Sequence, residues 1–284
     1  MSARKMSLLY ASLVFAAVLV PLQAQAAPGD IGVFSTICKF SHANDDDPIV
    51  YKGLQGAAHH HNFFGNVSTN YRTTTKSLEN NATNCDRPED PSGYWVPALY
   101  SDGVELPFEA VHVYYRNTAN SDKTLTVPFP RGLRMIAGTS AHSEPPPGSR
   151  TAEWACLGTE RVVSDDFPDT CPGQKVIATI TFPTCWDGVH LTSTDQSHMK
   201  YAWENTARPR SCPSSHPVVV PEITEWVRYY VRKADMTGLT LASGDGNSMH
   251  ADFWNAWDET ELQRLVDECL LAGRTCGTVG DGPF

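Results

Sequence analysis

The sequence predicts a mainly β protein, with a β-sandwich or jelly-roll-like core, long disulfide-held loops and a C-terminal α-helix. Three observations lead to this fold class. Short apolar runs rich in β-branched and aromatic residues recur between frequent Gly and Pro residues, as strands do between turns. One segment alone combines helical spacing with a capping pattern. Eight cysteines follow an apolar leader, which is typical of a disulfide-stabilised exported protein.

The strand pattern is clearest at residues 175–182, where β-branched residues dominate and polarity alternates. We expect further strands at residues 111–115, 123–129, 217–223 and 226–231. Proline, serine and glycine mark residues 143–150 and 164–173 as loops. Because strands dominate and no long linker or repeat interrupts them, a sandwich in one domain is the simplest arrangement.

The helix is predicted over residues 259–272. Asp258 is suited to the N-cap and Glu261 to the third helical position of a capping box. Gly273 follows as a C-terminal cap. The apolar residues recur at helical spacing and are expected to pack on the sheet: Leu262, Leu265, Val266, Cys269 and Leu270.

The N-terminus has the order of a secretory signal peptide. Arg4 and Lys5 precede an apolar run at residues 8–20, and Ala24 and Ala26 give the small-x-small pattern of a cleavage site. The run is too short for a membrane span, and no stop-transfer pattern follows that would favour an uncleaved anchor. We therefore expect a signal peptide at 1–26 and a single extracellular or periplasmic domain at 27–284, without a membrane span.

The charge of the mature chain is strongly negative. Removing Arg4 and Lys5 from 22 basic residues leaves 20 against 32 acidic residues, a net charge of −12. Such a surface repels polyanions, so nucleic acid and anionic membranes are not expected as partners. A neutral polysaccharide or cell-wall glycan is compatible with this charge.

The even number of cysteines predicts four disulfides. Eight cysteines allow 105 pairings, and three local options are Cys269–Cys276, Cys156–Cys171 and Cys185–Cys212. The absence of any C-x-x-C pair argues against a cysteine-rich zinc site. Cysteines used in this way are not available as nucleophiles.

Histidines carry the strongest chemical signal. In an extended His59-His60-His61 segment, His59 and His61 point to one face, and two imidazoles two residues apart are common metal-ligand geometry. A hydrogen-bonded histidine ladder or a solvated loop fits the pattern equally well, so metal and no metal are both open. Further histidines and carboxylates lie in segments that disulfides could hold close: Asp187, His190, His198, His216, His250 and Asp252.

Other catalytic motifs are missing. The sequence has no Gly-x-Ser-x-Gly, no His-Glu-x-x-His and no phosphate-binding glycine loop. Among the many aromatic residues, Tyr94 and Trp95 follow a turn-like Pro-Ser-Gly, which predicts partial exposure and stacking on sugar rings. Core packing is the alternative for each of them.

Seven segments form an ordered set, at residues 41–51, 59–66, 93–100, 185–188, 197–198, 212–218 and 250–258. This set resembles the domain-of-unknown-function family numbered nineteen ninety-six, from about His42 to Cys276. That family occurs in secreted bacterial and fungal proteins, and fungal members often carry a carbohydrate-binding WSC module. The resemblance implies a single extracellular domain and an association with glycans or cell walls, although this chain has no WSC-like module.

We interpret the chain as a secreted carbohydrate-active enzyme, a glycoside hydrolase or polysaccharide lyase. A divalent metal would bind His59, His61 and His250, or a histidine and a carboxylate would act as base and acid without metal. Two alternatives remain open, a non-catalytic glycan-binding module and a secreted metal-binding or structural protein. The candidate catalytic residues are His59, His61, Asp187, His190, His198, His250 and Asp252, and the candidate substrate contacts are Tyr94, Trp95 and His216.

Overall fold

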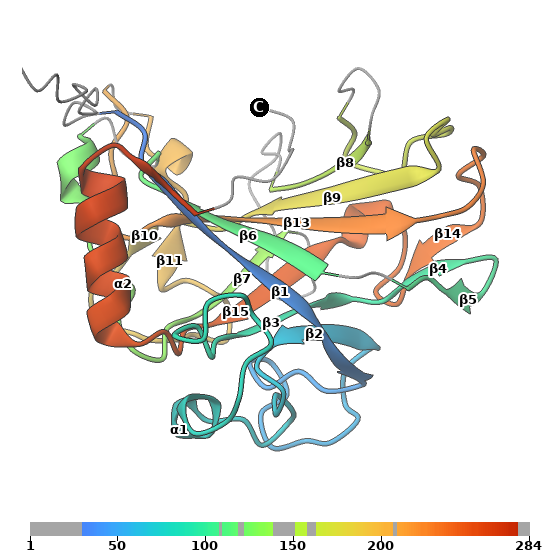
Figure 1. The fold of residues 1–284 in the computed structure, drawn as a ribbon, viewed down its shortest axis with the longest axis horizontal. Coiled ribbons are helices and arrows are strands. Elements are labelled where there is room, and N and C mark those ends of the chain that lie inside the picture. Colours follow the sequence, from blue (N-terminus) through green and yellow to red (C-terminus); the bar gives the residue numbers. More distant parts are fainter. Residues whose placement is uncertain are drawn as a thin grey trace, which may run out of the picture.

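The computed structural model describes residues 30–107, 110–118, 122–138, 151–157, 163–206 and 209–277. The predicted signal peptide and the predicted loop at residues 143–150 lie outside these ranges. The described residues form antiparallel sheets that pack as a sandwich and nearly close into a barrel, with one helix at the C-terminal end (Figure 1). The predicted fold class is therefore confirmed.

The strands and helices follow one another along the chain with long loops between them. The strands are β1 (Val33–Asn44), β2 (His61–Gly65), β3 (Gly93–Pro97), β4 (Leu99–Ser101), β5 (Val104–Glu105), β6 (Ala110–Arg116), β7 (Arg134–Gly138), β8 (Ala152–Cys156), β9 (Lys175–Thr181), β10 (Cys185–Trp186), β11 (Met199–Lys200), β12 (Val218–Val219), β13 (Glu222–Tyr230), β14 (Leu239–Leu241), β15 (His250–Trp254) and β16 (Thr275–Cys276). The α-helices are α1 (Thr75–Glu79) and α2 (Glu259–Leu265), and short 3₁₀ turns occupy Lys123–Leu125, Ala202–Glu204 and Gly246–Ser248.

The main sheet has the strand order β7-β15-β3-β2-β1-β6-β13-β9-β8. β1 joins its two halves, since Val33–Lys39 pair with β6 and the following residues pair with β2. The half containing β6, β13 and β9 lies over the half containing β2, β3 and β15, so their inner faces form the core between two layers (Figure 1).

A β-bulge in β1 marks the crossing between the two halves. Phe40 pairs with Phe64, whereas His42 pairs with the neighbouring Phe63. Adjacent residues of a strand face opposite sides of the sheet, so the bulge turns Phe40 to the inner face and His42 to the outer face. The His42 ring stacks on the Phe63 ring with centroids 4.9 Å apart.

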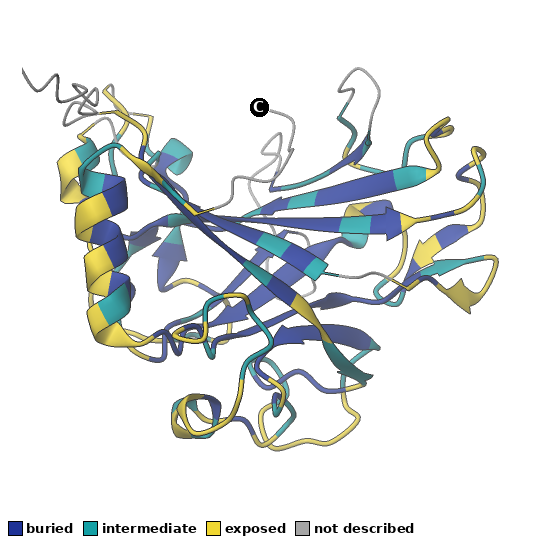
Figure 2. Cartoon of the chain, in the orientation of Figure 1, coloured by how far each residue is buried: buried dark blue, intermediate teal, exposed yellow. Residues whose placement is uncertain are grey.

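The core between the layers is strongly aromatic. The Phe34 and Tyr115 rings stack with centroids 4.5 Å apart, and Phe129 packs against both Tyr115 and Phe253. Figure 2 shows the buried residues concentrated in the central strands, with exposed residues on the outer side of α2 and in the peripheral loops. The burial of large apolar and aromatic side chains supplies most of the stabilisation of such a core.

Two predicted strands differ from the structure. Residues 123–129 do not form a strand, because Asp122 Oδ1 accepts hydrogen bonds from the backbone N–H and the hydroxyl of Thr124 and caps a 3₁₀ turn at Lys123–Leu125. Residues 217–223 are divided between β12 and β13 around Pro221, which has no N–H for a continuous ladder. The strands predicted at 111–115, 175–182 and 226–231 lie within or largely overlap β6, β9 and β13.

The C-terminal helix begins at Glu259, as predicted, and the Asp258 carboxylate accepts the backbone N–H of Glu261 at 2.9 Å. Its second half, Val266–Leu271, is a π-helix rather than a continuation of the α-helix. The backbone carbonyl of Leu270 accepts a hydrogen bond from the Asn117 amide instead of ending in solvent. Gly273 then adopts a positive φ of 63°, as expected of a C-terminal cap.

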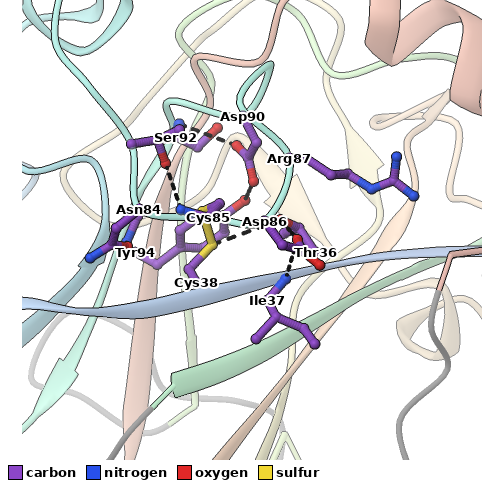
Figure 3. The surroundings of a disulfide bond; sticks show 12 residues. Thr36, Ile37, Cys38, Asn84, Cys85, Asp86, Arg87, Asp90, Ser92 and Tyr94 are labelled. Atoms are coloured by element: carbon purple, nitrogen blue, oxygen red, sulfur yellow. Dashed lines mark hydrogen bonds between the residues drawn. A yellow bond between two sulfur atoms is a disulfide. The ribbon is translucent and has the colours of Figure 1, made fainter.

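All eight cysteines form disulfides, and the three local pairings considered from the sequence are present together with Cys38–Cys85. Figure 3 shows that Asp86 lies beside the Cys38–Cys85 bond and accepts hydrogen bonds from Thr36 and Ile37 of β1. This bond therefore anchors the long loop after β2 to the strand that links the two layers. No helix within the described ranges has the length and apolar character needed to cross a membrane.

Candidate functional site

Three histidine side chains converge on the outer face of the β2-β3-β15 layer. The ring centroids are 4.2 Å apart for His59 and His61, 5.0 Å for His59 and His250, and 5.7 Å for His61 and His250. One ring nitrogen from each lies within 4.8 Å of the other two. The structure thus brings together three residues that the sequence analysis proposed as metal ligands.

Strand register explains why residues so far apart in sequence meet. His61 of β2 is paired with Pro97 of β3. On the other side of β3, Asp252 of β15 is paired with Trp95, and continuing this antiparallel register sets His250 beside Pro97. The two imidazoles therefore flank a compact proline ring on the same face of the sheet. His59, directly before β2, approaches them from the loop.

The tautomers of His61 and His250 are fixed by main-chain carbonyls. Nδ1 of His61 donates to the carbonyl of Asp46 at 3.0 Å, and Nδ1 of His250 donates to the carbonyl of Ser248 at 2.9 Å. A carbonyl can only accept, so Nδ1 carries the proton and the lone pair is on Nε2. Metal-bound histidines are commonly oriented by this second hydrogen bond. Nε2 of His59 and of His61 are buried without a hydrogen-bond partner among the described residues.

The environment favours the neutral form of His59 and His61. Burial lowers the pKa of His61 well below its usual value, and the neighbouring His250 and His59 lower it further. Burial also lowers the pKa of His59, against a smaller opposing effect of Asp45. A neutral imidazole is the form that binds a metal ion.

Two carboxyl groups lie close to His61. Asp47 and Asp252 each place an oxygen within 4.8 Å of a His61 ring nitrogen and of each other. Asp47 accepts the backbone N–H groups of Ile49 and Val50, whereas both oxygens of the fully buried Asp252 have no hydrogen-bond partner among the described residues. Burial raises the pKa of Asp252 well above its usual range, and the charges of Asp47 and Glu225 raise it further.

The loop before β2 is held by consecutive aspartates. Asp45 Oδ1 lies 2.6 Å from Nδ1 of His60. The carboxylate of Asp46 accepts the N–H groups of Gly56 and Tyr71, at 2.9 and 3.1 Å. These bonds tie the chain on both sides of His59 to the end of β1. They explain how a loop residue can join the two histidines carried by strands.

A polar pocket of about 590 Å³ is lined by His60, the residue between His59 and His61 in sequence, but by none of the three clustered histidines. Asp46, whose backbone carbonyl holds His61, belongs to its wall. The Arg72 guanidinium lies 4.9 Å from the centroid of the Tyr71 ring in the same wall. The lining residues are Asn44, Asp45, Asp46, Gln55, Gly56, His60, Asn70, Tyr71 and Arg72.

The other candidate catalytic residues form a separate group. The Nδ1 atom of His190 lies 2.6 Å from the Asp187 carboxylate. The His190 side chain is largely exposed. Although burial raises the pKa of Asp187, hydrogen bonds from His190 and Val189 hold it at about 2. His198 Nε2 donates to the carbonyl of Arg134, at the end of β7 opposite to the end that pairs with His250.

The candidate substrate contacts have structural roles instead. His216 Nε2 donates to the backbone carbonyl of Ser197, which ties two loops together. Tyr94 and Trp95 are completely buried, so the expected partial exposure is wrong. Their alternation in β3 sends Tyr94 into the core between the layers and Trp95 against Phe63 on the outer face. Neither ring can lie flat against a polysaccharide.

Sequence reasoning did not select Asp47 for the site. The signal available was the run Asp45-Asp46-Asp47 at the end of β1, because short acidic side chains there can accept several loop N–H groups. No feature of the sequence indicates which of these aspartates would face the histidines.

The sequence of the chain matches a known family. The family model described as "Domain of unknown function (DUF1996)" matches residues 47–257, which include Asp47, all three histidines of the cluster and Asp252. This chain belongs to the DUF1996 family. No curated protein and no solved structure matches it.

Proposed function

We propose that this chain is an exported, carbohydrate-active enzyme, a hydrolase or lyase, whose reaction centre is a divalent transition-metal ion bound by His59, His61 and His250. The observation that carries this proposal is the convergence of three imidazoles, two of which present Nε2 because Nδ1 donates to a carbonyl. Such pre-oriented neutral imidazoles are what a metal centre requires.

The donor set favours zinc or copper over calcium or magnesium. Imidazole nitrogen is a ligand of intermediate softness that suits Zn²⁺ and Cu²⁺, whereas Ca²⁺ and Mg²⁺ prefer oxygen ligands. Three histidines also leave a coordination position open, as catalytic zinc sites do. The partial exposure of His59 makes the cluster accessible from the loop side.

A metal ion in this position would activate a water molecule or polarise a substrate oxygen. Asp252 is the nearby carboxyl group available for proton transfer, since its oxygens bind no other described group. Asp47, in contrast, is occupied by loop N–H groups and helps to shape the site. This division gives the two carboxyl groups different roles.

The polar pocket lined in part by His60 supports a carbohydrate as substrate. Amide, carboxylate and imidazole groups in its wall can exchange several hydrogen bonds with hydroxyl groups, and Tyr71 offers a ring. The net charge of −12 expected for the mature chain favours a neutral glycan over a polyanion. The four disulfides are typical of proteins in oxidising compartments, which supports export.

The first test is metal analysis of untagged protein loaded with zinc or copper and then dialysed. We expect one equivalent of metal in the wild type and a loss of most of it in His59→Ala and His250→Ala. His190→Ala is the matched control, because this histidine lies in the separate group. Equal metal content in the wild type and both cluster variants would refute the metal centre.

The second test measures product release from a panel of neutral glycans by the metal-loaded and the chelator-treated protein. Turnover that depends on metal and falls at least about a hundredfold in His59→Ala would support the enzyme proposal, because metal-site changes typically act on this scale. Metal binding with no turnover on any glycan would contradict catalysis. Retention on insoluble glycan without turnover would instead identify a binding module.

A further inference from the structure

Asn62, the residue after His61, faces the opposite side of β2. It shares the inner face with Phe64, whereas His61 shares the outer face with Phe63. Its side chain is fully buried, and neither its amide nitrogen nor its amide oxygen has a hydrogen-bond partner among the described residues. A buried donor and acceptor left unpaired destabilise a fold, so such a group calls for an explanation.

A small pocket has Asn62 among its lining residues. It has a volume of about 270 Å³ and is lined by Phe40, Asn62, Glu105, Leu106 and Pro107. Three of the five side chains are apolar, and the polar groups are one amide and one carboxylate. This composition, apolar walls with a few polar groups, is typical of a small-molecule site.

The bulge in β1 creates the aromatic wall of this pocket. Because the bulge turns Phe40 to the inner face beside Phe64, the ring lies at the edge of the core rather than on the outer layer. Phe40 is nevertheless 42% exposed. An aromatic ring that is half in contact with solvent at the mouth of a pocket offers a flat apolar surface to a ligand.

We propose that this pocket binds one neutral sugar unit, independently of the metal centre. The Asn62 amide can donate to one hydroxyl group and accept from its neighbour, so a vicinal pair satisfies both of its unpaired atoms. The apolar face of the ring would lie against Phe40, and the Glu105 carboxylate would accept a further hydroxyl. The volume fits a single ring, which distinguishes this pocket from the larger one lined in part by His60.

The two sites are neighbours without sharing ligand-binding atoms. The Glu105 carboxylate lies 3.8 Å from Nε2 of His60, and His60 and Asn62 flank His61 in sequence. The histidine cluster is on the outer face of β2 and the pocket is on its inner face. Sugar binding here therefore does not require a metal ion, and its failure can be separated from failure of the proposed reaction centre.

The test is saturation-transfer NMR with glucose, galactose, mannose and N-acetylglucosamine, each added separately to the purified protein. We expect at least one of them to give a signal, and Phe40→Ala and Asn62→Leu to weaken its binding by about tenfold or more, as loss of a good contact does. Leu54→Ala is the control, because Leu54 is an exposed apolar residue outside the pocket.

Thermal unfolding separates binding from folding. Because Asn62→Leu replaces an unpaired amide by an apolar group of similar size, we expect the free variant to be at least as stable as the wild type. His59→Ala should lose metal but keep the sugar signal. The proposal is overturned if none of the four sugars gives a signal, or if the signal survives in both pocket variants. Phe40→Ala alone decides the question should Asn62→Leu fail to fold.

Discussion

Asp90 is a carboxyl group held wholly inside the protein, beside the Cys38–Cys85 bond (Figure 3). The Tyr94 hydroxyl donates to it at 2.7 Å, and the backbone N–H of Ser92 donates at 3.2 Å. The hydroxyl groups of Tyr94 and Tyr115 are hydrogen-bonded to each other, and Trp257 donates to the latter. Asp90 is thus the final acceptor of a polar chain through the aromatic core.

Burial raises the pKa of Asp90 to about 7, although its hydrogen bonds oppose the shift. The folded protein therefore keeps this proton up to about pH 7, whereas the unfolded chain loses it near pH 4, so the free energy of unfolding falls as the pH rises between these values. We expect Asp90→Asn to remove this fall, with a relative gain of up to about 4 kcal/mol above pH 7 compared with acid.

Denaturant unfolding of wild type and Asp90→Asn across this pH interval measures the effect. Asp169→Asn, which changes an exposed carboxylate, is the control and should follow the wild-type profile. Parallel profiles for wild type and Asp90→Asn would show that Asp90 is already ionised in the folded state.

At the residue scale, the sequence pattern predicted which side chains share a face more successfully than it predicted which side chains are buried. The alternation of His59 and His61 was identified correctly, because period-two geometry is local. The turn before Tyr94 predicted exposure for both aromatics, but β3 lies between β2 and β15 and is covered on both faces. Burial of a central strand depends on its neighbours, which a single sequence does not reveal.

Gly138, at the end of β7, shows how an element positions the site. It adopts a positive φ of 88°, and a Cβ atom there would lie 2.3 Å from the Met249 carbonyl oxygen and 2.8 Å from the Cα atom of His250. The close approach of β7 to β15 at this point requires glycine. Any larger residue would displace the strand end that carries His250.

We therefore expect Gly138→Ala to destabilise the protein by about 3 kcal/mol or more, as backbone clashes with strain do, and to weaken metal binding. Gly103→Ala is the matched control. Gly103 also has a positive φ, of 78°, but a Cβ atom there meets nothing within 4 Å, so we expect a loss of only about 1–2 kcal/mol from backbone strain. Thermal unfolding together with metal content measures both effects. An equal loss of stability in the two variants would show that the close contact of Gly138 with β15 does not add to the cost of the substitution.

At the element scale, prediction succeeded where local chemistry and tertiary pairing agree. The β-branched run at β9 pairs on both sides, and the Asp258 cap starts α2 at the expected residue. Prediction failed at residues 123–129, because a capping aspartate outweighed an alternating pattern. The change to a π-helix at Val266 had no signal in the local pattern, and the end of this helix is hydrogen-bonded to Asn117, far away in sequence.

At the scale of the whole molecule, the disulfides are expected to contribute unequally to stability, because they close loops of different length. Cys38–Cys85 spans 47 residues and connects β1 with the loop between β2 and β3, whereas Cys269–Cys276 spans only 7 residues at the C-terminal end. In the chain-entropy description, a crosslink stabilises more when it closes a longer loop.

We expect Cys38→Ala/Cys85→Ala to lower the free energy of unfolding by about 4 kcal/mol and Cys269→Ala/Cys276→Ala by about 2.4 kcal/mol. Denaturant unfolding of both double variants measures the difference. The first variant should also lose metal affinity, because the released loop donates the Tyr71 N–H to Asp46, whose backbone carbonyl orients His61. A larger loss in the second variant would contradict the loop-length argument.

For the whole molecule, the strand-like runs, the single helical pattern and the cysteines were sufficient to predict the fold class. How the site residues meet could be explained only from the strand order of the sheet. His250 is separated from His61 by most of the chain, and their meeting follows from the insertion of β3 between β2 and β15. The sequence also offered Asp187 and His190 as candidate catalytic residues, yet those residues lie together at a different loop. Only the strand order distinguishes the two sets.

The alternation of β2 has a consequence for how this protein can change. The side chain of His61 lies on one face of the sheet and that of Asn62 on the other. A shift of the strand register by one residue would therefore place each side chain on the opposite face. Insertions and deletions in β2 would therefore damage both surfaces at once. Point substitutions, in contrast, can alter either surface alone, which leaves them as the route by which evolution or a protein engineer could give one face a new specificity while the other keeps its chemistry.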